Sequence, residues 1–208
     1  LLLMGALFAF WKSSAPVVAY LLDTYGGSAA AYSLRKLSSS TSNVVRVRRS
    51  SDNAEQDFTA TEITDGTLTT FTGVSDGFVA IWYDQSGNSF DAAQTAAASQ
   101  PKIVSSGSVI LENGKPAIYF DNSNDTLVTG VNLSINNIRS FYSVNMASTT
   151  SNFRTIFSNS YNQNDSVYVG LNINLMRYQN WIQNKNNPSY TITTLSNTQY
   201  LVDGFFEQ

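Results

Sequence analysis

The 208-residue chain contains no cysteine and no histidine. Without cysteine it has no disulfide, thiol nucleophile or thiolate zinc site, and without histidine it has no imidazole acid or base and no triad that depends on one. Any catalysis therefore rests on carboxylates, Tyr, Lys or a metal held by oxygen ligands. The absence of cysteine leaves the redox compartment open, because a chain of this length is stable without disulfides.

Charge is also scarce, since Asp, Glu, Lys and Arg make up 13% of the chain. The 12 basic residues are outnumbered by 15 acidic ones, and the resulting net charge of −3 argues against the basic surface that binds nucleic acid. Hydrophobic residues, at 42%, are sufficient for a packed core, which excludes global disorder. Abundant Ser, Thr and Asn favour turns and strands over helix interiors, so the composition predicts an all-β fold.

A long apolar run stands at the N-terminus, from Leu1 to Trp11. It is about half as long as a membrane-spanning helix, and it lacks the basic residues that precede a signal-peptide core, although a signal peptide stays an alternative. After a polar break, residues 17–22 are apolar again. We expect residues 1–28 to be an apolar arm that docks on another subunit, a membrane or a partner's groove, because such a segment is otherwise an aggregation hazard. An ordinary core element is the other interpretation.

The remainder, residues 29–208, is predicted to be one domain of short strands with a single helix at residues 29–37, where helix formers end in basic residues. Alternating Val and Arg predict a half-buried strand at 44–49, and an apolar run predicts a central strand at 77–83. Further strands are predicted at 102–104, 109–111, 117–120, 140–146, 154–157, 166–174, 176–183, 190–194 and 199–206. Short strands at this spacing, without βαβ alternation, predict a β-sandwich or jelly roll.

Several short motifs, taken in their order, resemble a concanavalin A-like or laminin-G-like jelly-roll domain. They are AYSLR at 31–35, VRVRRSSDN at 45–53, WYDQSGN at 82–88, GKPA at 114–117 and FDNSND at 120–125. The string YDQSGN is similar to one in the catalytic domain of the α-L-arabinofuranosidase B family, the nearest named relative. Similar blocks occur in phage spike and fibre modules and in bacterial surface proteins, for which no glycosidase activity is implied. The resemblance covers residues 29–125 in detail.

The two branches of this resemblance imply different functions. A retaining glycosidase needs two carboxylates about 5–5.5 Å apart, and the arabinofuranosidase nucleophile is a Glu on a strand in the second half of the domain. The best matching stretch here, SVYVGLN at 166–172, has no acidic residue. We therefore expect a non-enzymatic display module of a phage virion spike or fibre, or of a bacterial surface protein, which recognises a host glycan at the virion or cell surface.

Two alternatives to this function stay open. One is an arabinofuranosidase-like glycoside hydrolase that uses Asp84 with Asp121 or Asp203. The other is a purely structural capsid or filament subunit without a ligand. In each case we expect a homo-oligomer, with the segment from Leu1 to Trp11 as a contact to other subunits.

Two groups of residues are candidates for binding a ligand. The first, at the end of the predicted central strand, consists of Trp82, Tyr83, Asp84 and Asn88. Its aromatic faces and polar groups suit the binding of a sugar. The same residues are also explained without a ligand, if Trp82 packs in the core and Asp84 and Asn88 close a turn, and this is the preferred interpretation. The second group consists of Tyr178 and Trp181, in a polar stretch that favours recognition of hydroxyl-rich or protein ligands. Core packing of Trp181 is an equal alternative.

Two further clusters have chemical potential. Asp121, Asn124 and Asp125 form an oxygen-rich loop that suits Ca²⁺, but the EF-hand spacing is missing and a plain turn is the preferred interpretation. We expect no other cofactor. The second cluster is basic and consists of Arg46, Arg48 and Arg49. We expect it to form a solvated strand face, or pairs with Asp52 and Glu55, rather than a polyanion site.

The predicted strand at 199–206 ends two residues before the sequence does. In the domains that the chain resembles, further hairpins follow and complete both sheets, and their absence would leave open hydrophobic edges. We therefore expect the chain to be a fragment of a longer protein or to be completed by a neighbouring subunit. Residues 1–22 are the one local segment able to fill the gap by folding back.

Overall fold

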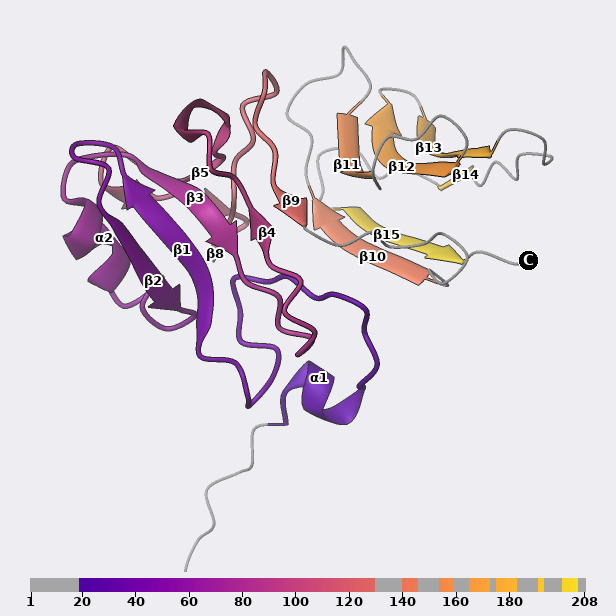
Figure 1. Ribbon diagram of the computed structural model, residues 1–208, viewed down its shortest axis with the longest axis horizontal. Helices are drawn as coiled ribbons and strands as arrows, with labels where there is room; N and C mark the ends of the chain where they lie inside the picture. The colour runs from indigo at the N-terminus through magenta and orange to yellow at the C-terminus, as the bar shows by residue number, and fades with distance from the viewer. Residues whose placement is uncertain are drawn as a thin grey trace, which may run out of the picture.

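The computed structural model describes residues 19–129 continuously and, beyond them, the strand segments 140–145, 154–158, 165–172, 175–182, 191–192 and 200–205. Antiparallel sheets dominate this part of the chain, and its two α-helices, α1 (Leu21–Thr24) and α2 (Thr67–Thr72), are short (Figure 1). The all-β class that the composition predicts is therefore confirmed.

The first described part is built on one seven-stranded sheet, in which the strand order is β2-β1-β3-β4-β9 and β5 and β6 extend from β3. The bounds are β1 (Asn43–Arg49), β2 (Glu55–Thr59), β3 (Gly77–Trp82), β4 (Ala92–Ala93), β5 (Lys102–Ser105), β6 (Ser108–Val109) and β9 (Val128–Thr129). A hairpin of β7 (Leu111–Glu112) and β8 (Lys115–Pro116) and a 3₁₀ turn η1 (Ala97–Ser99) complete it. The strand predicted at 77–83 is central, since β3 pairs with β1, β4 and β5.

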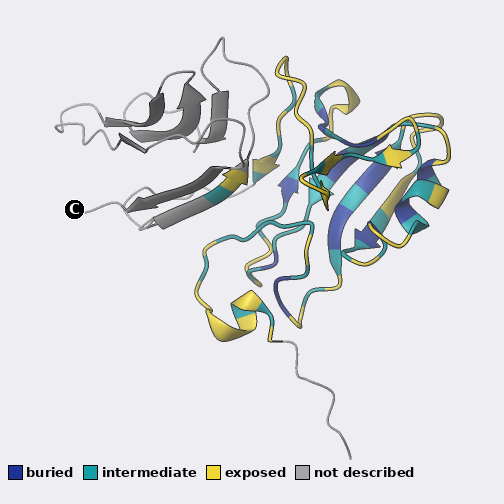
Figure 2. Ribbon diagram, turned by 180° about the vertical axis from the view of Figure 1, so that it is seen from behind, coloured by how far each residue is buried: buried dark blue, intermediate teal, exposed yellow. Residues whose placement is uncertain are grey.

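The core lies where this sheet meets α2. Its buried residues are Val44, Val45, Val47, Phe58, Ile63, Leu68, Val79, Ile103 and Val104, and most of the buried positions lie in the strands (Figure 2). Gly77 allows the close approach of the helix, because a Cβ atom there would lie 3.0 Å from Cγ2 of Thr72 and 3.1 Å from Cγ1 of Val47. A small residue is therefore needed where β3 passes under α2.

The opposite face of the same sheet is polar. Successive residues of a strand point to opposite faces, so the residues next to the buried valines form rows on the face away from α2. One row, across three strands, is Arg48, Phe78 and Lys102, and a second pairs Arg46 with Asp57. We call this side of the sheet the polar face.

Two further sheets are described between residues 140 and 205. One pairs β10 (Ser140–Asn145) with β15 (Tyr200–Phe205), and the other follows chain order through β11 (Arg154–Ser158), β12 (Asp165–Asn172), β13 (Leu175–Ile182) and β14 (Thr191–Ile192). These strands fall within or beside those that the sequence predicts, so the strand pattern of the second half is confirmed.

The prediction of a helix at residues 29–37 is wrong. These residues form an irregular extended segment, which we call the strap (residues 28–37). Its backbone groups bond to side chains of residues 84–88, more than 45 positions away, instead of to each other. Local helix propensity therefore loses to long-range polar contacts. The two helices that do form escaped prediction, and α2 lies between Gly66 and Gly73, both with positive φ.

The predicted arm is described only from residue 19. Residues 1–18, and with them the segment from Leu1 to Trp11, lie outside the described residues. At the C-terminal end of the arm, α1 is bound to the last residue of the strap and to Ser39 beyond it, because Leu22 N donates to Leu37 O at 2.9 Å and Asp23 Oδ1 accepts from Ser39 N at 3.0 Å. No helix in the described part of the chain is long and apolar enough to cross a membrane.

Candidate functional site

The turn after β3 closes on itself and on the strap. The carboxylate of Asp84 accepts four hydrogen bonds, from the backbone N–H groups of Ala31, Ser86 and Phe90 at 2.8–3.0 Å and from the hydroxyl of Ser86 at 2.6 Å. Burial opposes ionisation, but these hydrogen bonds outweigh it and hold the pKa of Asp84 below its usual value. Four bonds use the lone pairs that a carboxylate offers, so Asp84 serves the fold.

The two amide side chains of the turn are bound in the same way. Gln85, which is 1% exposed, accepts from Leu37 N at 2.7 Å and donates to the carbonyls of Ser33 and Arg35. Asn88 Nδ2 lies 3.0 Å from the carbonyl oxygens of Ser28 and Ala29. The turn that the sequence analysis prefers as an explanation is therefore present, and it also positions the strap.

Trp82 is partly buried and packs against the core. Its ring lies 5.7 Å, centroid to centroid, from that of Tyr32 in the strap, with the planes tilted by 45°. The Tyr32 hydroxyl donates to Phe90 O. Within the described residues, Nε1 of Trp82 is a buried side-chain donor without a partner. Trp82 thus joins the strap to the sheet, as the core interpretation predicts.

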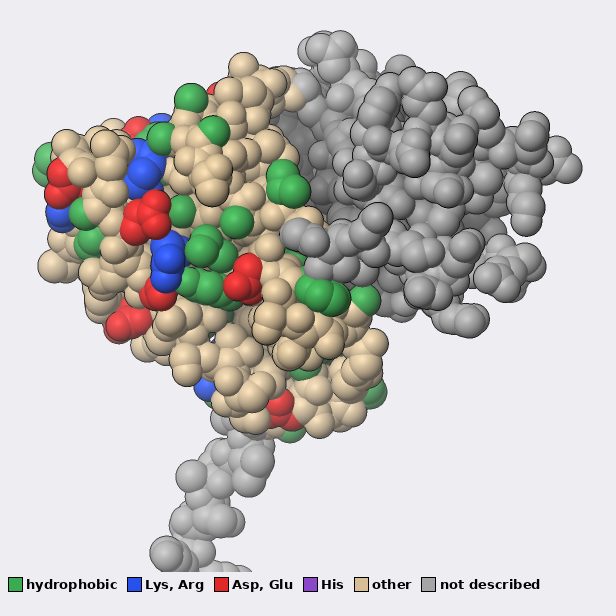
Figure 3. All heavy atoms as spheres, viewed as in Figure 1, with side chains coloured by type: hydrophobic (Ala, Val, Ile, Leu, Met, Phe, Trp, Pro, Cys, Tyr) green, Lys and Arg blue, Asp and Glu red, His purple; other side chains and the backbone are tan. Residues whose placement is uncertain are grey.

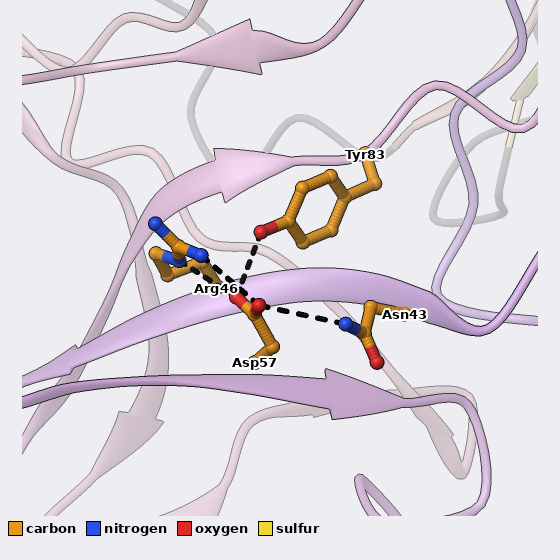
Figure 4. A network of polar contacts seen from close by, with 4 residues as sticks. All are labelled: Asn43, Arg46, Asp57 and Tyr83. Carbon is orange, nitrogen blue, oxygen red and sulfur yellow. Dashed lines mark hydrogen bonds and ion pairs between the residues drawn. The ribbon is translucent and has the colours of Figure 1, made fainter. Parts of the chain in front are cut away.

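Tyr83 belongs to a polar network on the polar face (Figure 4). Its hydroxyl donates to Asp57 Oδ1 at 2.7 Å, and Arg46 binds both oxygens of Asp57 at 2.6 and 3.0 Å. Arg46 holds the pKa of Asp57 below its usual range, whereas burial and the nearby carboxylate raise the pKa of Tyr83 to about 12. Because these groups satisfy one another, the network fixes β1, β2 and the end of β3.

The three arginines of β1 differ in their partners and in their exposure. Arg49 pairs with Asp52 at 2.6 Å, as predicted, but Arg46 pairs with Asp57 and not with Glu55. Arg48 is 8% exposed, so the expectation of a solvated face or a carboxylate pair is wrong for it. Its side chain is covered by Phe78 and by the loop that contains Gln100, neither of which the local sequence pattern of β1 reveals. Lys, Arg, Asp and Glu side chains lie next to one another over β1 to β3 in Figure 3.

A cleft of about 330 Å³ is the candidate functional site. Its lining comes from β3, β5, the segment with η1 and the loop before β9. The lining residues are Phe78, Ala97, Ala98, Gln100, Lys102, Tyr119, Asp121 and Asp125. Phe78 and Lys102 place it at the polar face. Backbone bonds in both directions between Lys102 and Tyr119, at 2.8 and 2.9 Å, join the loop to β5. Pairing across the sheet thus brings together residues far apart in sequence.

The cleft combines an exposed ring with carboxylates that keep free oxygens. Tyr119 is 49% exposed. Asp121 accepts from Ser123 N through Oδ1, and Asp125 accepts from Asp121 N through Oδ2, both at 2.8 Å. The second oxygen of each has no hydrogen-bond partner among the described residues. Burial, with the Asp121 charge nearby, raises the pKa of Asp125. This arrangement accepts hydrogen bonds beside an aromatic surface.

The oxygen-rich loop of the cleft has the contacts of a turn. Asn124 Nδ2 donates to Ser99 Oγ at 3.1 Å, and Asn122 adopts a positive φ of 68°. In the described ranges, no group of three or more Asp or Glu side chains is placed to hold a metal ion. The turn interpretation of Asp121, Asn124 and Asp125 therefore explains their geometry.

The other predicted residues are described only through the backbone. Tyr178 and Trp181 lie on β13, opposite Val169 and Ser166 of β12, and Asp203 lies on β15. Their side chains are outside the described residues. Comparisons of the chain with family models, with curated proteins and with solved structures find no match.

Among the residues that line the cleft, Asp121 and Asp125 were predicted from the sequence as candidate ligand-binding residues, and the others were not. Phe78, Gln100, Lys102 and Tyr119 sit in separate strands and loops, and no spacing along the chain connects them. The only available signal is the block at 114–125, where an aromatic pair precedes the acidic loop.

Proposed function

We propose that the chain is a non-enzymatic jelly-roll display module that binds carbohydrate in the cleft of the polar face. The observation that carries the proposal is that the exposed Tyr119 ring lines the same cleft as Asp121 and Asp125, each of which has one carboxylate oxygen without a hydrogen-bond partner among the described residues. Sugars present C–H faces that pack on aromatic rings and hydroxyls that donate to carboxylates. The acidic lining favours neutral or cationic sugars over acidic ones.

The proposal also includes the jelly-roll fold and a position on the surface of a virion or cell. The seven-stranded antiparallel sheet supports the jelly roll, since the motif blocks that resemble concanavalin A-like domains fall on β1, on the turn after β3 and around the cleft. The resemblance to spike, fibre and surface modules, together with the apolar segment from Leu1 to Trp11, supports a homo-oligomer on a virion or cell surface. The absence of an acidic residue from 166–172 supports a binding rather than a catalytic role.

Binding to a glycan array tests the proposal, with the full chain compared with Tyr119→Ala. Loss of one aromatic contact of about 0.5–1.5 kcal/mol predicts an affinity lower by a factor of about 2 to about 12. Tyr25→Ala is the matched control, because Tyr25 is 70% exposed and does not line the cleft. An array without any bound oligosaccharide, or an equal loss in both variants, contradicts the proposal.

Hydrolysis is the second candidate, favoured by one observation: Asp121 and Asp125 line the same cleft, and the raised pKa of Asp125 suits a general acid. Asp84 is not a suitable partner because its oxygens are occupied. The test is release of a chromophore from an aryl arabinofuranoside. Release that Asp125→Asn abolishes and Asp84→Asn leaves intact in the folded fraction establishes the hydrolase. No release from the wild-type chain supports the binding module.

A further inference from the structure

Arg48 is a buried cation without a carboxylate partner among the described residues. Its side chain donates from Nε to Gln100 Oε1 at 2.6 Å, from Nη1 to Asn53 Oδ1 at 2.9 Å and from Nη2 to Ala97 O at 3.3 Å. All three acceptors are neutral. Burial of a charge is costly unless its polar atoms are satisfied, and an apolar side chain would avoid that cost. The residue therefore calls for a role beyond filling space.

The partners of Arg48 belong to the cleft. Gln100 and Ala97 line it, and the guanidinium carbon lies 4.9 Å from the ring centroid of Phe78, a third lining residue. Lys102 Nζ lies 5.4 Å from the same ring. Arg48 thus contacts Phe78 of β3 as well as Ala97 and Gln100 of the segment with η1, although it does not itself line the cleft.

Gln100 connects Arg48 to the rest of the segment that contains η1 through further hydrogen bonds. Its Nε2 donates to Gln94 O at 2.7 Å, and the side chain of Gln94 accepts from Ala96 N at 2.9 Å. Ser99 N then donates to Ala96 O at 2.9 Å and closes η1. A continuous path of hydrogen bonds runs from the guanidinium into the backbone of residues 94–100, which we call the cleft wall.

We propose that Arg48 is the positioning residue of the carbohydrate cleft, and that its planar guanidinium holds the cleft wall against Phe78 in the geometry that binds sugar. The inference rests on the proposed function for the nature of the ligand. A planar group with several fixed donors is required, because the three acceptors lie in different segments and the same group also stacks on a ring. A lysine ammonium in this place satisfies fewer of these contacts at once.

The chain provides a matched control in the next residue of β1. The guanidinium carbon of Arg49 also lies 4.9 Å from a phenyl centroid, that of Phe71, and Arg49 Nη1 also donates to a backbone carbonyl, Phe71 O, at 2.7 Å. Arg49, however, lies on the face that carries α2. Arg48→Lys and Arg49→Lys therefore make the same chemical change on opposite faces of one sheet.

The experiment compares both variants of the full chain with wild type by hydrogen–deuterium exchange. In Arg48→Lys we expect exchange at the amides of Ala96 and Ser99 to become about tenfold faster, because the wall loses hydrogen bonds to a charged group. In Arg49→Lys these amides exchange as in wild type. Equal exchange in all three chains overturns the inference, as does equal acceleration in both variants.

Affinity for the oligosaccharide that wild type binds most strongly on the array gives the second readout. We expect about tenfold weaker binding by Arg48→Lys and none of this loss in Arg49→Lys. Unchanged affinity in Arg48→Lys overturns the positioning role. If wild type binds no oligosaccharide, the proposed function fails, and the exchange at the cleft wall decides by itself whether Arg48 holds that wall.

A second variant covers the case in which Arg48→Lys does not fold. Asn53 is exposed and has a φ of 60°, so Asn53→Gly removes the acceptor of Nη1 while it keeps the backbone conformation. We expect about threefold faster exchange at Ala96 and Ser99 in this variant, since one of three contacts is lost. Unchanged exchange there overturns the inference.

Discussion

The carboxylate of Asp84 carries much of the order between the turn after β3 and the strap. It accepts four hydrogen bonds, from Ala31 in the strap and from Ser86 and Phe90 in the loop between β3 and β4. An asparagine offers a single acceptor oxygen and turns an N–H₂ group towards donors. A substitution that hardly changes the size of the side chain therefore breaks about half of these contacts.

Asp84→Asn is expected to lower the free energy of unfolding at pH 7 by about 2–4 kcal/mol, from two lost bonds to a charged acceptor. Because the folded-state pKa of Asp84 is depressed, its contribution is present above the unfolded-state pKa of about 4 and is lost as pH falls through the folded value. The difference between wild type and variant therefore shrinks in acid. Urea unfolding from neutral to acidic pH measures it.

Asp65→Asn is the control for this prediction. Asp65 is exposed and accepts one backbone bond, from Thr67 N at 2.9 Å. We expect a loss smaller than that in Asp84→Asn, because only one solvent-exposed hydrogen bond is affected. An Asp84→Asn variant no less stable than Asp65→Asn at pH 7 contradicts the role given to Asp84.

At the scale of elements, most of the longer strands were predicted, but β2 and both helices were not, and the strand predicted at 117–120 is only an isolated bridge at Tyr119. The apolar run at 77–83 and the Val–Arg alternation at 44–49 reflect burial on a sheet, which local periodicity reports. The strap contains residues that favour a helix, but its backbone is extended, and the side chains of Gln85 and Asn88 donate hydrogen bonds to its carbonyl groups. The Thr-rich α2 has poor helix propensity and is held by burial of Leu68 and Thr72 against the sheet, which no local signal reveals.

The contact between β3 and α2 gives a prediction at this scale. In Gly77→Ala the new methyl group would lie 3.0–3.1 Å from atoms of Thr72, Val104 and Val47. Such overpacking predicts a loss of about 1–3 kcal/mol in the free energy of unfolding, measured in urea. Gly26→Ala, with no atom within 4 Å of the added Cβ, is expected to leave it nearly unchanged. Equal stability of the two variants contradicts the packing described for α2.

At the scale of the molecule, one sheet separates a core from a polar face. The face next to α2 carries the hydrophobic core, and the other carries the Arg46–Asp57 pair, the buried Arg48 and the cleft. Composition predicts the sheet but not the cleft, because Phe78, Tyr119 and Asp125 are far apart in the sequence and line one cleft only in the folded chain. The motif after β3 accordingly points to Asp84 and Asn88, whose polar groups form hydrogen bonds within the fold.

We propose that carbohydrate binds in the cleft and not at the turn after β3. Titration of the ¹⁵N-labelled full chain with the oligosaccharide selected on the array distinguishes the two positions. We expect amide chemical-shift changes at Lys102, Tyr119 and Asp125 and none at Asp84 and Asn88. Changes centred on Asp84 and Asn88, with the cleft residues unmoved, would contradict it.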